Sequence, residues 1–171
     1  MTTARDLVAL AKPRITALVA MTSVAGYYAA PGQAQLGRGK TAALVLGSLL
    51  IIGGANALNM YLERDIDGLA PRTRKRPLPA GRMAPAVALW FGIILGAGGL
   101  FFLSLLNLLT GFLGLLALSL YVCVYTPMKQ SSAGALVVGA VSGAMPSLMG
   151  WTAVTGRLDL AGISLFAILF L

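Results

Sequence analysis

The sequence contains no histidine, one cysteine and only five carboxylate residues among 171. The absence of histidine excludes, within these residues, a histidine zinc site, a His-based catalytic triad and a His-ligated haem. Cys123 lies inside an apolar run, so neither an internal disulfide nor a cysteine metal cluster is expected. Any chemistry in this chain must therefore rest on oxygen, amide and cationic side chains.

Apolar residues, by contrast, are abundant. They make up 58% of the chain, charged residues make up 11%, and the apolar residues form runs long enough to cross a bilayer. This pattern predicts an all-α polytopic transmembrane bundle. Spans are expected at about 15–30, 41–62, 85–106, 112–126 and 133–155, with a sixth starting near 161 and too short at residue 171 to cross. A tight turn is expected at 107–111, and Pro127 is expected to close the fourth span.

The cations indicate membrane phosphates as partners. The net charge is +8, but the charges lie in loops beside the spans, which favours anionic lipid head groups and phosphates over nucleic acid. Alternating the loops places three cations on one side, namely Arg38, Lys40 and Arg157. The other side has ten, namely Arg5, Lys12, Arg14, Arg64, Arg72, Arg74, Lys75, Arg76, Arg82 and Lys129. The positive-inside rule therefore predicts a cytoplasmic amino terminus and a cytoplasmic 59–83 region.

Three of the five acids fall within five positions, at Glu63, Asp65 and Asp67. Asn59, Glu63 and Asp67 are spaced i, i+4, i+8, so in a continuing helix they share one face over roughly 12 Å, whereas Asp65 points elsewhere. Mg²⁺ binds one or two carboxylates and completes its coordination with phosphate and water. We therefore predict Asn59, Glu63 and Asp67 as catalytic metal ligands. The alternative is a solvated helix end.

A cationic run follows the acids, with Arg72, Arg74, Lys75, Arg76 and Arg82. These side chains would complement phosphate charge, although a basic loop beside a span is also typical of a topogenic signal. Lys129 has the same two interpretations. Trp151 is more typical of an interfacial anchor, and Pro146 in mid-span favours a kink that lines a cavity.

At these residues the sequence resembles a known family. Asn59-x₃-Glu63-x₃-Asp67 is similar to the first aspartate-rich motif of the UbiA-type intramembrane prenyltransferases, with Glu63 where that family usually has Asp. The flanking NMYLERDID and RTRKRPLPAG narrow the resemblance to the protoheme IX farnesyltransferases, or haem O synthases. Further similar segments are Lys12-Pro13-Arg14, Tyr125-Thr126-x₂-Lys129 and the Gly143–Trp151 helix. The chain departs from the family after Lys129, where an Arg and an Asn are lost, and at Ser147, which replaces a proline.

The resemblance implies transfer of a farnesyl group from farnesyl diphosphate to a vinyl group of protoheme IX (haem b), giving haem O and diphosphate. Haem b would be a substrate and Mg²⁺ the cofactor. The diphosphate-binding residues implied are Arg72, Arg76, Lys129 and Arg14, and Tyr61 and Tyr125 would line the substrate site. Because the family has nine spans, residues 1–171 are expected to form one transmembrane prenyltransferase domain, incomplete at its carboxyl end and inactive alone. The expected location is the bacterial inner membrane, with terminal oxidase assembly proteins as possible contacts.

Other interpretations remain open at this point. The chain would also suit a non-catalytic membrane fragment or assembly partner, or a related prenyltransferase acting on a quinone or chlorin precursor. A CDP-alcohol phosphotransferase motif is partly matched by Asp67-Gly68-x₂-Pro71-Arg72. The later acids of that motif would fall near Pro85 and Leu89, where there are none, so this interpretation is rejected.

Overall fold

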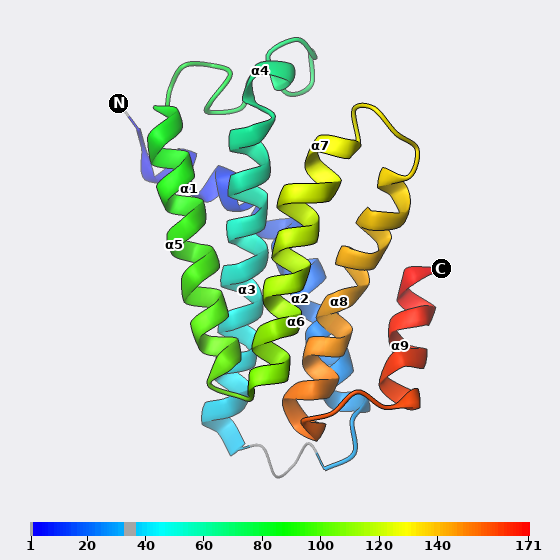
Figure 1. Ribbon diagram of the computed structural model, residues 1–171. Coiled ribbons are helices and arrows are strands. Elements are labelled where there is room, and N and C mark those ends of the chain that lie inside the picture. Colours follow the sequence, from blue (N-terminus) through cyan, green and yellow to red (C-terminus); the bar gives the residue numbers. More distant parts are fainter. Residues whose placement is uncertain (1, 33–36) are drawn as a thin grey trace.

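The computed structural model describes residues 2–32 and 37–171, and all regular structure within them is helical. The elements are α1 (Ala4–Ala11), α2 (Pro13–Ala29), α3 (Gly37–Leu62), α4 (Arg64–Asp67), α5 (Pro85–Ser104), α6 (Leu108–Ser119), the π-helical segment η2 (Leu120–Tyr125), α7 (Thr126–Met128), α8 (Ala135–Thr155) and α9 (Leu160–Phe170). The long helices stand side by side as a bundle (Figure 1). The predicted all-α bundle is confirmed.

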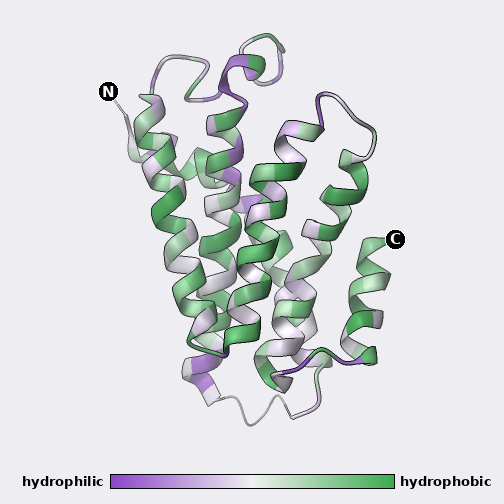
Figure 2. Cartoon of the chain, viewed as in Figure 1, coloured by the Kyte–Doolittle hydropathy of each residue, from purple (hydrophilic) through white to green (hydrophobic). Residues whose placement is uncertain are grey.

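Four segments are long and apolar enough to cross a membrane, namely α3, α5, the continuous Leu108–Met128 segment and α8. The pair α1 and α2 makes a fifth if it is one span bent by 42°, and α9 is an apolar helix of 11 residues. Apolar residues occupy the middle of the bundle, while hydrophilic ones gather at its two ends (Figure 2). Five spans and a short sixth segment were expected. Part of the predicted 31–40 loop, residues 33–36, lies outside the described residues.

Glycine permits the close approach of α3 and α5. Gly92, Gly96 and Gly99 form one face of α5, and all three are buried. A Cβ added to Gly99 would lie 2.5 Å from the backbone nitrogen of Ile51, which is closer than real atoms approach. A Cβ added to Gly54 on α3 would lie 2.7 Å from the backbone nitrogen of Gly96, so this glycine also permits close helix contact. These close contacts with α5 involve α3 residues from Gly47 to Leu58, so they reach the residue before Asn59.

The fourth span starts earlier than expected and ends where it was expected to end. The predicted turn at Asn107–Gly111 is wrong, because α6 already begins at Leu108 and the chain turns at 105–107. Asn107 is the N-cap of α6, and its side chain accepts a hydrogen bond from the Thr110 backbone N–H at 2.8 Å. At the other end the continuous segment stops at Met128, one residue after Pro127, so the predicted end of this span is confirmed.

Candidate active site

Asn59, Glu63 and Asp67 form a buried column where α3 passes into α4. Glu63 lies at a bend between the two helices, yet the i→i−4 backbone bonds continue, from Glu63 N to Asn59 O at 3.0 Å and from Asp67 N to Glu63 O at 2.8 Å. The exposed fractions of the three residues are 2%, 5% and 7%. The predicted column therefore exists, bent rather than straight. We refer to these three residues as the acidic column.

Asp65 points away from this column, as predicted. Its side chain is 84% exposed and its nearest cation is Arg64, at 3.8 Å from Nε to Oδ1. Arg64 in turn stacks over the Tyr61 ring, 4.7 Å from its centre. Asp65 is thus exposed while Asp67 is buried, because two residues of helix rotate the side-chain direction by about 200°.

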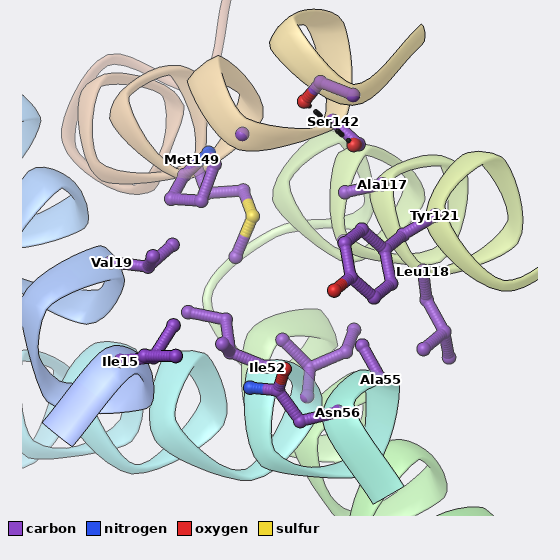
Figure 3. Close-up of a pocket in the computed structure, with 15 residues that line it drawn as sticks. Ile15, Val19, Ile52, Ala55, Asn56, Ala117, Leu118, Tyr121, Ser142 and Met149 are labelled. Atoms are coloured by element: carbon purple, nitrogen blue, oxygen red, sulfur yellow. Dashed lines mark hydrogen bonds between the residues drawn. The ribbon is translucent and has the colours of Figure 1, made fainter. Parts of the chain in front are cut away.

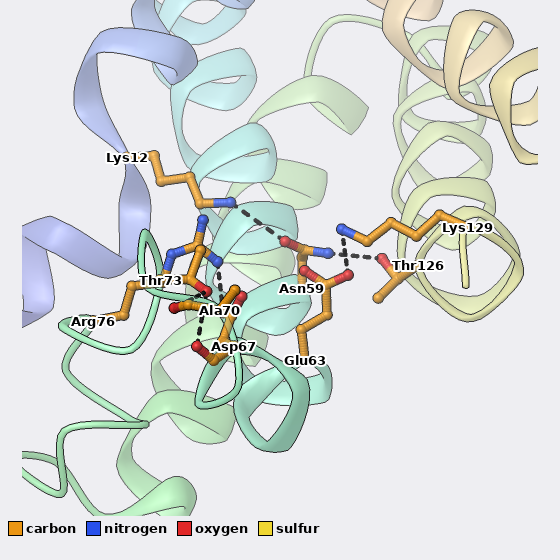
Figure 4. Close-up of polar contacts among 9 residues, drawn as sticks. All are labelled: Lys12, Asn59, Glu63, Asp67, Ala70, Thr73, Arg76, Thr126 and Lys129. Carbon is orange, nitrogen blue, oxygen red and sulfur yellow. Dashed lines mark hydrogen bonds and ion pairs between the residues drawn. The ribbon is translucent and has the colours of Figure 1, made fainter.

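Each member of the acidic column faces a different cation (Figure 4). Lys12 Nζ donates to Asn59 Oδ1 at 3.3 Å, and Arg76 donates to Asp67 Oδ2 at 2.5 Å. Lys129 forms an ion pair with Glu63. The three cations come from the α1–α2 junction, from the loop after α4 and from the residue after α7. Three segments far apart in the sequence therefore meet at the acidic column. The ion pairs and hydrogen bonds between them offset the free-energy cost of burying these charges.

Lys12 occupies a constrained position between α1 and α2. Its φ of +47° makes it the one non-glycine residue with positive φ in the described part of the chain, and it precedes the proline that starts α2. Such a conformation is costly for a side chain with a Cβ and is typically found at functional sites. Burial lowers the pKa of Lys12 to about 8, with Arg76 acting in the same direction and Glu63 opposing it.

The loop between α4 and α5 is anchored to the bundle. The Thr73 hydroxyl donates to the backbone carbonyl of Asp67 at 2.7 Å, and Leu78 and Met83 are buried against α1, α3 and α5. Arg82 Nε lies 3.2 Å from Asp6 Oδ1 on α1. Hydrogen bonds from Thr3 and from Arg82 lower the pKa of the Asp6 carboxyl, so this ion pair is present at neutral pH. These contacts hold the backbone that carries Arg76.

The other predicted phosphate ligands are placed differently from one another. Arg72 is exposed and lines a basic cleft together with Lys12, Lys75, Arg76 and Arg82. Arg14 is exposed and makes no ion pair with any residue that the structure describes. The structure thus brings Arg76 and Lys129 to the column and Arg72 beside it. It brings Lys12 there rather than Arg14, and the role of each in binding phosphate stays a prediction.

An apolar cleft begins one helical turn from the acidic column. Ile52, Ala55 and Asn56 of α3 lie on its wall, and Asn59 follows on the same helix. The opposite walls come from α2, the α6–η2 segment and α8, with Val19, Tyr121, Pro146 and Met149 among the lining residues (Figure 3). The space is about 590 Å³, part of it open to the surroundings. Pro146 therefore does line a cavity, as its position in mid-span indicated.

The tyrosine that reaches this cleft is Tyr121, which the motif comparison did not select. Tyr125 stacks against it, with ring centres 5.2 Å apart, and the Lys129 ammonium lies 5.8 Å from the Tyr125 ring centre. Tyr61 faces the small apolar cluster formed around Leu10 and Ala57. Neither Tyr61 nor Tyr125 lines the cleft, so their predicted contact with substrate has no support from this geometry.

The donors of the acidic column suit a hard divalent cation. Within residues 2–32 and 37–171, no group of three or more His, Cys, Asp or Glu side chains is arranged to hold a metal. Two carboxylates and an amide oxygen are nevertheless the ligands that Mg²⁺ takes when phosphate and water complete its shell. Each carboxylate can accept at both oxygens, so pairing with one cation leaves capacity for a metal. The residues therefore fit Mg²⁺ only in the presence of such additional ligands.

Sequence reasoning gave no role to Lys12, Thr126 or Tyr121, although Lys12 and Thr126 lie in segments that resemble the family. Lys12 had one readable signal, because proline favours the first turn of a helix and Pro13 therefore indicates a helix start. The left-handed backbone of Lys12, which sets its side-chain direction, had no such signal. Thr126 accepts a hydrogen bond from Asn59 Nδ2 at 3.1 Å, and its own hydroxyl donates to the Tyr121 carbonyl at 2.8 Å. Thr126 and Tyr121 are five residues apart, and their contact depends on the π-helical segment. A search for residues on one face of an α-helix, which has a period of 3.6 residues, does not pair them.

Comparison with curated proteins gives close matches. The chain is 55% identical over 167 residues to a protoheme IX farnesyltransferase from Anaeromyxobacter dehalogenans, covering 97% of this chain and 56% of that protein. It is 52% identical over 171 residues to one from Myxococcus xanthus, covering 99% of this chain and 58% of that protein. The chain thus spans slightly more than half the length of the relatives it matches.

Solved structures share the fold at low sequence identity. One, described as digeranylgeranylglyceryl phosphate synthase in membranes, matches with a TM-score of 0.85 and 16% identity, over 97% of this chain and 58% of the other. Another, the apo form of a UbiA homologue from Aeropyrum pernix K1, gives a TM-score of 0.69 and 18% identity, over 99% and 60%. The UbiA prenyltransferase family itself matches residues 18–171, and the chain therefore belongs to that family.

Proposed function

We propose that the intact protein transfers a farnesyl group from farnesyl diphosphate to a vinyl group of protoheme IX, giving haem O and diphosphate. The observation that carries the proposal is a buried acidic column with three facing cations, set at the end of an apolar cleft. A diphosphate joined to a long hydrocarbon has this same division between charged and apolar parts. The acceptor is proposed from the relatives, which are protoheme IX farnesyltransferases.

The cations of the site would bind the diphosphate and stabilise it as a leaving group. When the allylic C–O bond breaks, the electron pair stays on the diphosphate, and its added charge is met by groups already held in place. Arg76 can bind two phosphate oxygens at once, whereas Lys12 and Lys129 act as point charges. The electrons for the new C–C bond come from the vinyl group, and the cation left on that group is quenched by water, which releases a proton and leaves a hydroxyl group on the product.

The apolar cleft would hold the farnesyl chain and exclude water from the allylic cation. Tyr121 offers an aromatic face and Met149 a polarisable thioether inside the cleft (Figure 3). Small residues on the facing helices, Gly114, Gly139 and Gly143, leave the space open. Tyr121 is therefore the aromatic side chain that we propose beside the reacting carbon.

We propose Mg²⁺ as the cofactor, held by Asn59, Glu63 and Asp67 together with diphosphate oxygens. When bound, it would supply Lewis-acid stabilisation of the leaving diphosphate. The column has only two carboxylates, and the described part of the chain has no group of three or more His, Cys, Asp or Glu side chains that could hold a metal. For this reason we further propose that residues 1–171 do not catalyse the reaction alone.

Turnover is tested with the intact enzyme in detergent, supplied with farnesyl diphosphate, haem b and MgCl₂ and analysed for haem O by chromatography. We expect haem O to form, to be lost with EDTA, and to be absent with residues 1–171 alone. Farnesylation of a quinone or chlorin acceptor in preference to haem b would replace the proposed acceptor. Turnover by residues 1–171 would contradict the proposed need for further ligands.

We propose that the protein lies in the bacterial inner membrane, with the end that carries the acidic column facing the cytoplasm. Ten of the thirteen cations lie at that end in the predicted topology. Cysteines introduced at Lys75 and at Arg157, after replacement of the exposed Cys123 by serine, should label from opposite sides of sealed vesicles. Labelling of both from one side would contradict the orientation.

A further inference from the structure

The amide of Asn59 has a different kind of partner on each side. Its Nδ2 donates to Thr126 Oγ1 at 3.1 Å, and its Oδ1 accepts from Lys12 Nζ at 3.3 Å (Figure 4). Asn59 and Thr126 are 2% and 1% exposed, so water does not substitute for either partner. An amide oxygen and nitrogen are hard to distinguish by shape, and the direction of this amide must be set by its hydrogen-bond partners.

The direction follows from how Thr126 uses its single hydrogen. A threonine hydroxyl donates one hydrogen bond and accepts up to two. The Thr126 hydroxyl donates to the backbone carbonyl of Tyr121 at 2.8 Å. Toward Asn59 it can therefore only accept, so the NH₂ group of Asn59 must face Thr126. The oxygen of Asn59 is then left on the side of Lys12 and the acidic column.

The π-helical segment η2 brings the carbonyl of Tyr121 to this position. The Thr126 backbone N–H bonds the Tyr121 carbonyl across five residues, and the Thr126 hydroxyl bonds the same carbonyl. With α-helical bonding the Tyr121 carbonyl would be paired to residue 125 instead. The π-helical backbone of the fourth span thus helps to determine that the oxygen of Asn59, and not its NH₂ group, points toward the acidic column.

We infer that Thr126 is a positioning residue that holds the oxygen of Asn59 toward the acidic column, where a divalent cation with its diphosphate would bind. This inference rests on the proposed function, since it concerns the metal ligand named there. Thr126 itself touches neither metal nor substrate in this role. Without this hydroxyl, the Asn59 Nδ2 loses its buried acceptor, and Lys12 alone is left to hold the oxygen toward the column. The amide is then less well fixed in the one orientation that can bind a cation, since an NH₂ group cannot bind one.

The test compares Thr126→Val, which keeps the shape and removes the hydroxyl, with Thr126→Ser, which keeps the hydroxyl. Binding of inorganic diphosphate to the intact enzyme is measured by titration calorimetry, first in EDTA and then over a series of MgCl₂ concentrations. We expect Thr126→Val to raise the Mg²⁺ concentration needed for half-maximal binding about 3- to 10-fold, the size of one hydrogen bond. Thr126→Ser should stay within about twofold of the wild type.

Two further measurements separate positioning from a general loss of structure. Diphosphate binding in EDTA depends on the cations alone and should be unchanged in both variants. Thr152→Val is a matched control, because Thr152 is also fully buried and bonds a helix carbonyl, that of Leu148 at 2.8 Å. It should lower Tm without altering the Mg²⁺ requirement. If Thr126→Val does not fold, Thr126→Ala takes its place in the same comparison with Thr126→Ser.

The inference is overturned if Thr126→Val or Thr126→Ala needs no more Mg²⁺ than the wild type. It is also overturned if the serine variant is impaired as much as the valine variant, or if binding in EDTA falls by the same factor. A wild type whose diphosphate binding ignores Mg²⁺ would overturn the proposed metal role, and the inference with it. That outcome can be told apart from the others because the wild type itself, and not only a variant, would then bind diphosphate independently of Mg²⁺.

Discussion

The two ends of the bundle each contain an asparagine that joins helices, and the two differ in their partners. At one end Asn107 accepts from Thr110 N at 2.8 Å and from Thr110 Oγ1 at 2.9 Å, and it donates to the Thr152 carbonyl at 2.8 Å. All of these partners are neutral. At the other end Asn59 has one neutral partner, Thr126, and one cation, Lys12.

This difference separates a structural polar network from one suited to binding charge. The Asn107 network caps α6 and links it to α8, and its hydrogen bonds are made within the protein. Around Asn59, two acids and three cations are buried or half-buried together, which is costly unless each charge finds a partner. We therefore expect substitutions at the Asn59 end to change activity and those at the Asn107 end to change stability.

The largest effect is expected at Asp67. In the intact enzyme, Asp67→Asn should lower haem O formation by on the order of 10²-fold or more, because it removes a charged ligand from the column. Asp65→Asn is the matched control and should cost about threefold or less, since Asp65 is exposed and weakly paired. Glu63→Asp should retain activity because a carboxylate remains. Equal losses at Asp65 and Asp67 would contradict the column.

The next effect distinguishes Lys12 from Arg14. Lys12→Met should weaken binding of inorganic diphosphate about 10- to 100-fold, the size of a charge-assisted hydrogen bond, whereas Arg14→Met should have little effect. Both variants remove one positive charge from the same segment, so a general loss of charge would weaken both equally. Titration calorimetry on the intact enzyme measures the difference. A stronger effect at Arg14 would favour the residue suggested by sequence alone.

A smaller effect is expected from the ion pair that anchors the basic loop. Arg82→Met should weaken diphosphate binding about threefold by loosening the loop that carries Arg76, and the exposed Arg74→Met should not. Asp6→Asn provides the critical comparison. If Arg82 acts by anchoring, Asp6→Asn also weakens binding; if only the local charge matters, loss of an acid strengthens it.

The smallest effect on activity is expected at Asn107. Asn107→Ala should destabilise the protein by about 1 to 2 kcal/mol through loss of a helix cap and an interhelical bond, which appears as a lower Tm in detergent. Diphosphate binding below that Tm should match the wild type. A change in the Mg²⁺ requirement of Asn107→Ala would remove the distinction between the two ends.

The fold was largely predictable because most spans are apolar runs of membrane-spanning length with few charges. The lengths of the apolar runs alone placed the ends of α3, α5 and α8 to within a few residues. The errors fell where one residue decides the local backbone. Asn107 caps a helix that was expected to start later, and Lys12 has a left-handed backbone that no pattern indicated. A capping bond or a π-helical segment adds little to the hydropathy pattern, so such a pattern does not reveal it.

The sequence by itself determined which acids can share a face, since the i, i+4, i+8 spacing of Asn59, Glu63 and Asp67 follows from helical periodicity. It also determined that the cations facing these acids would be Lys or Arg, because the chain has no histidine. Most of its Lys and Arg residues fall at one end in the predicted topology. Only the tertiary structure decided that Lys12, Arg76 and Lys129 each meet one member of the column. It also decided that Thr126 orients Asn59. Those pairings join residues up to 67 positions apart, and their geometry depends on how α2, α3 and the fourth span pack, which no local pattern specifies.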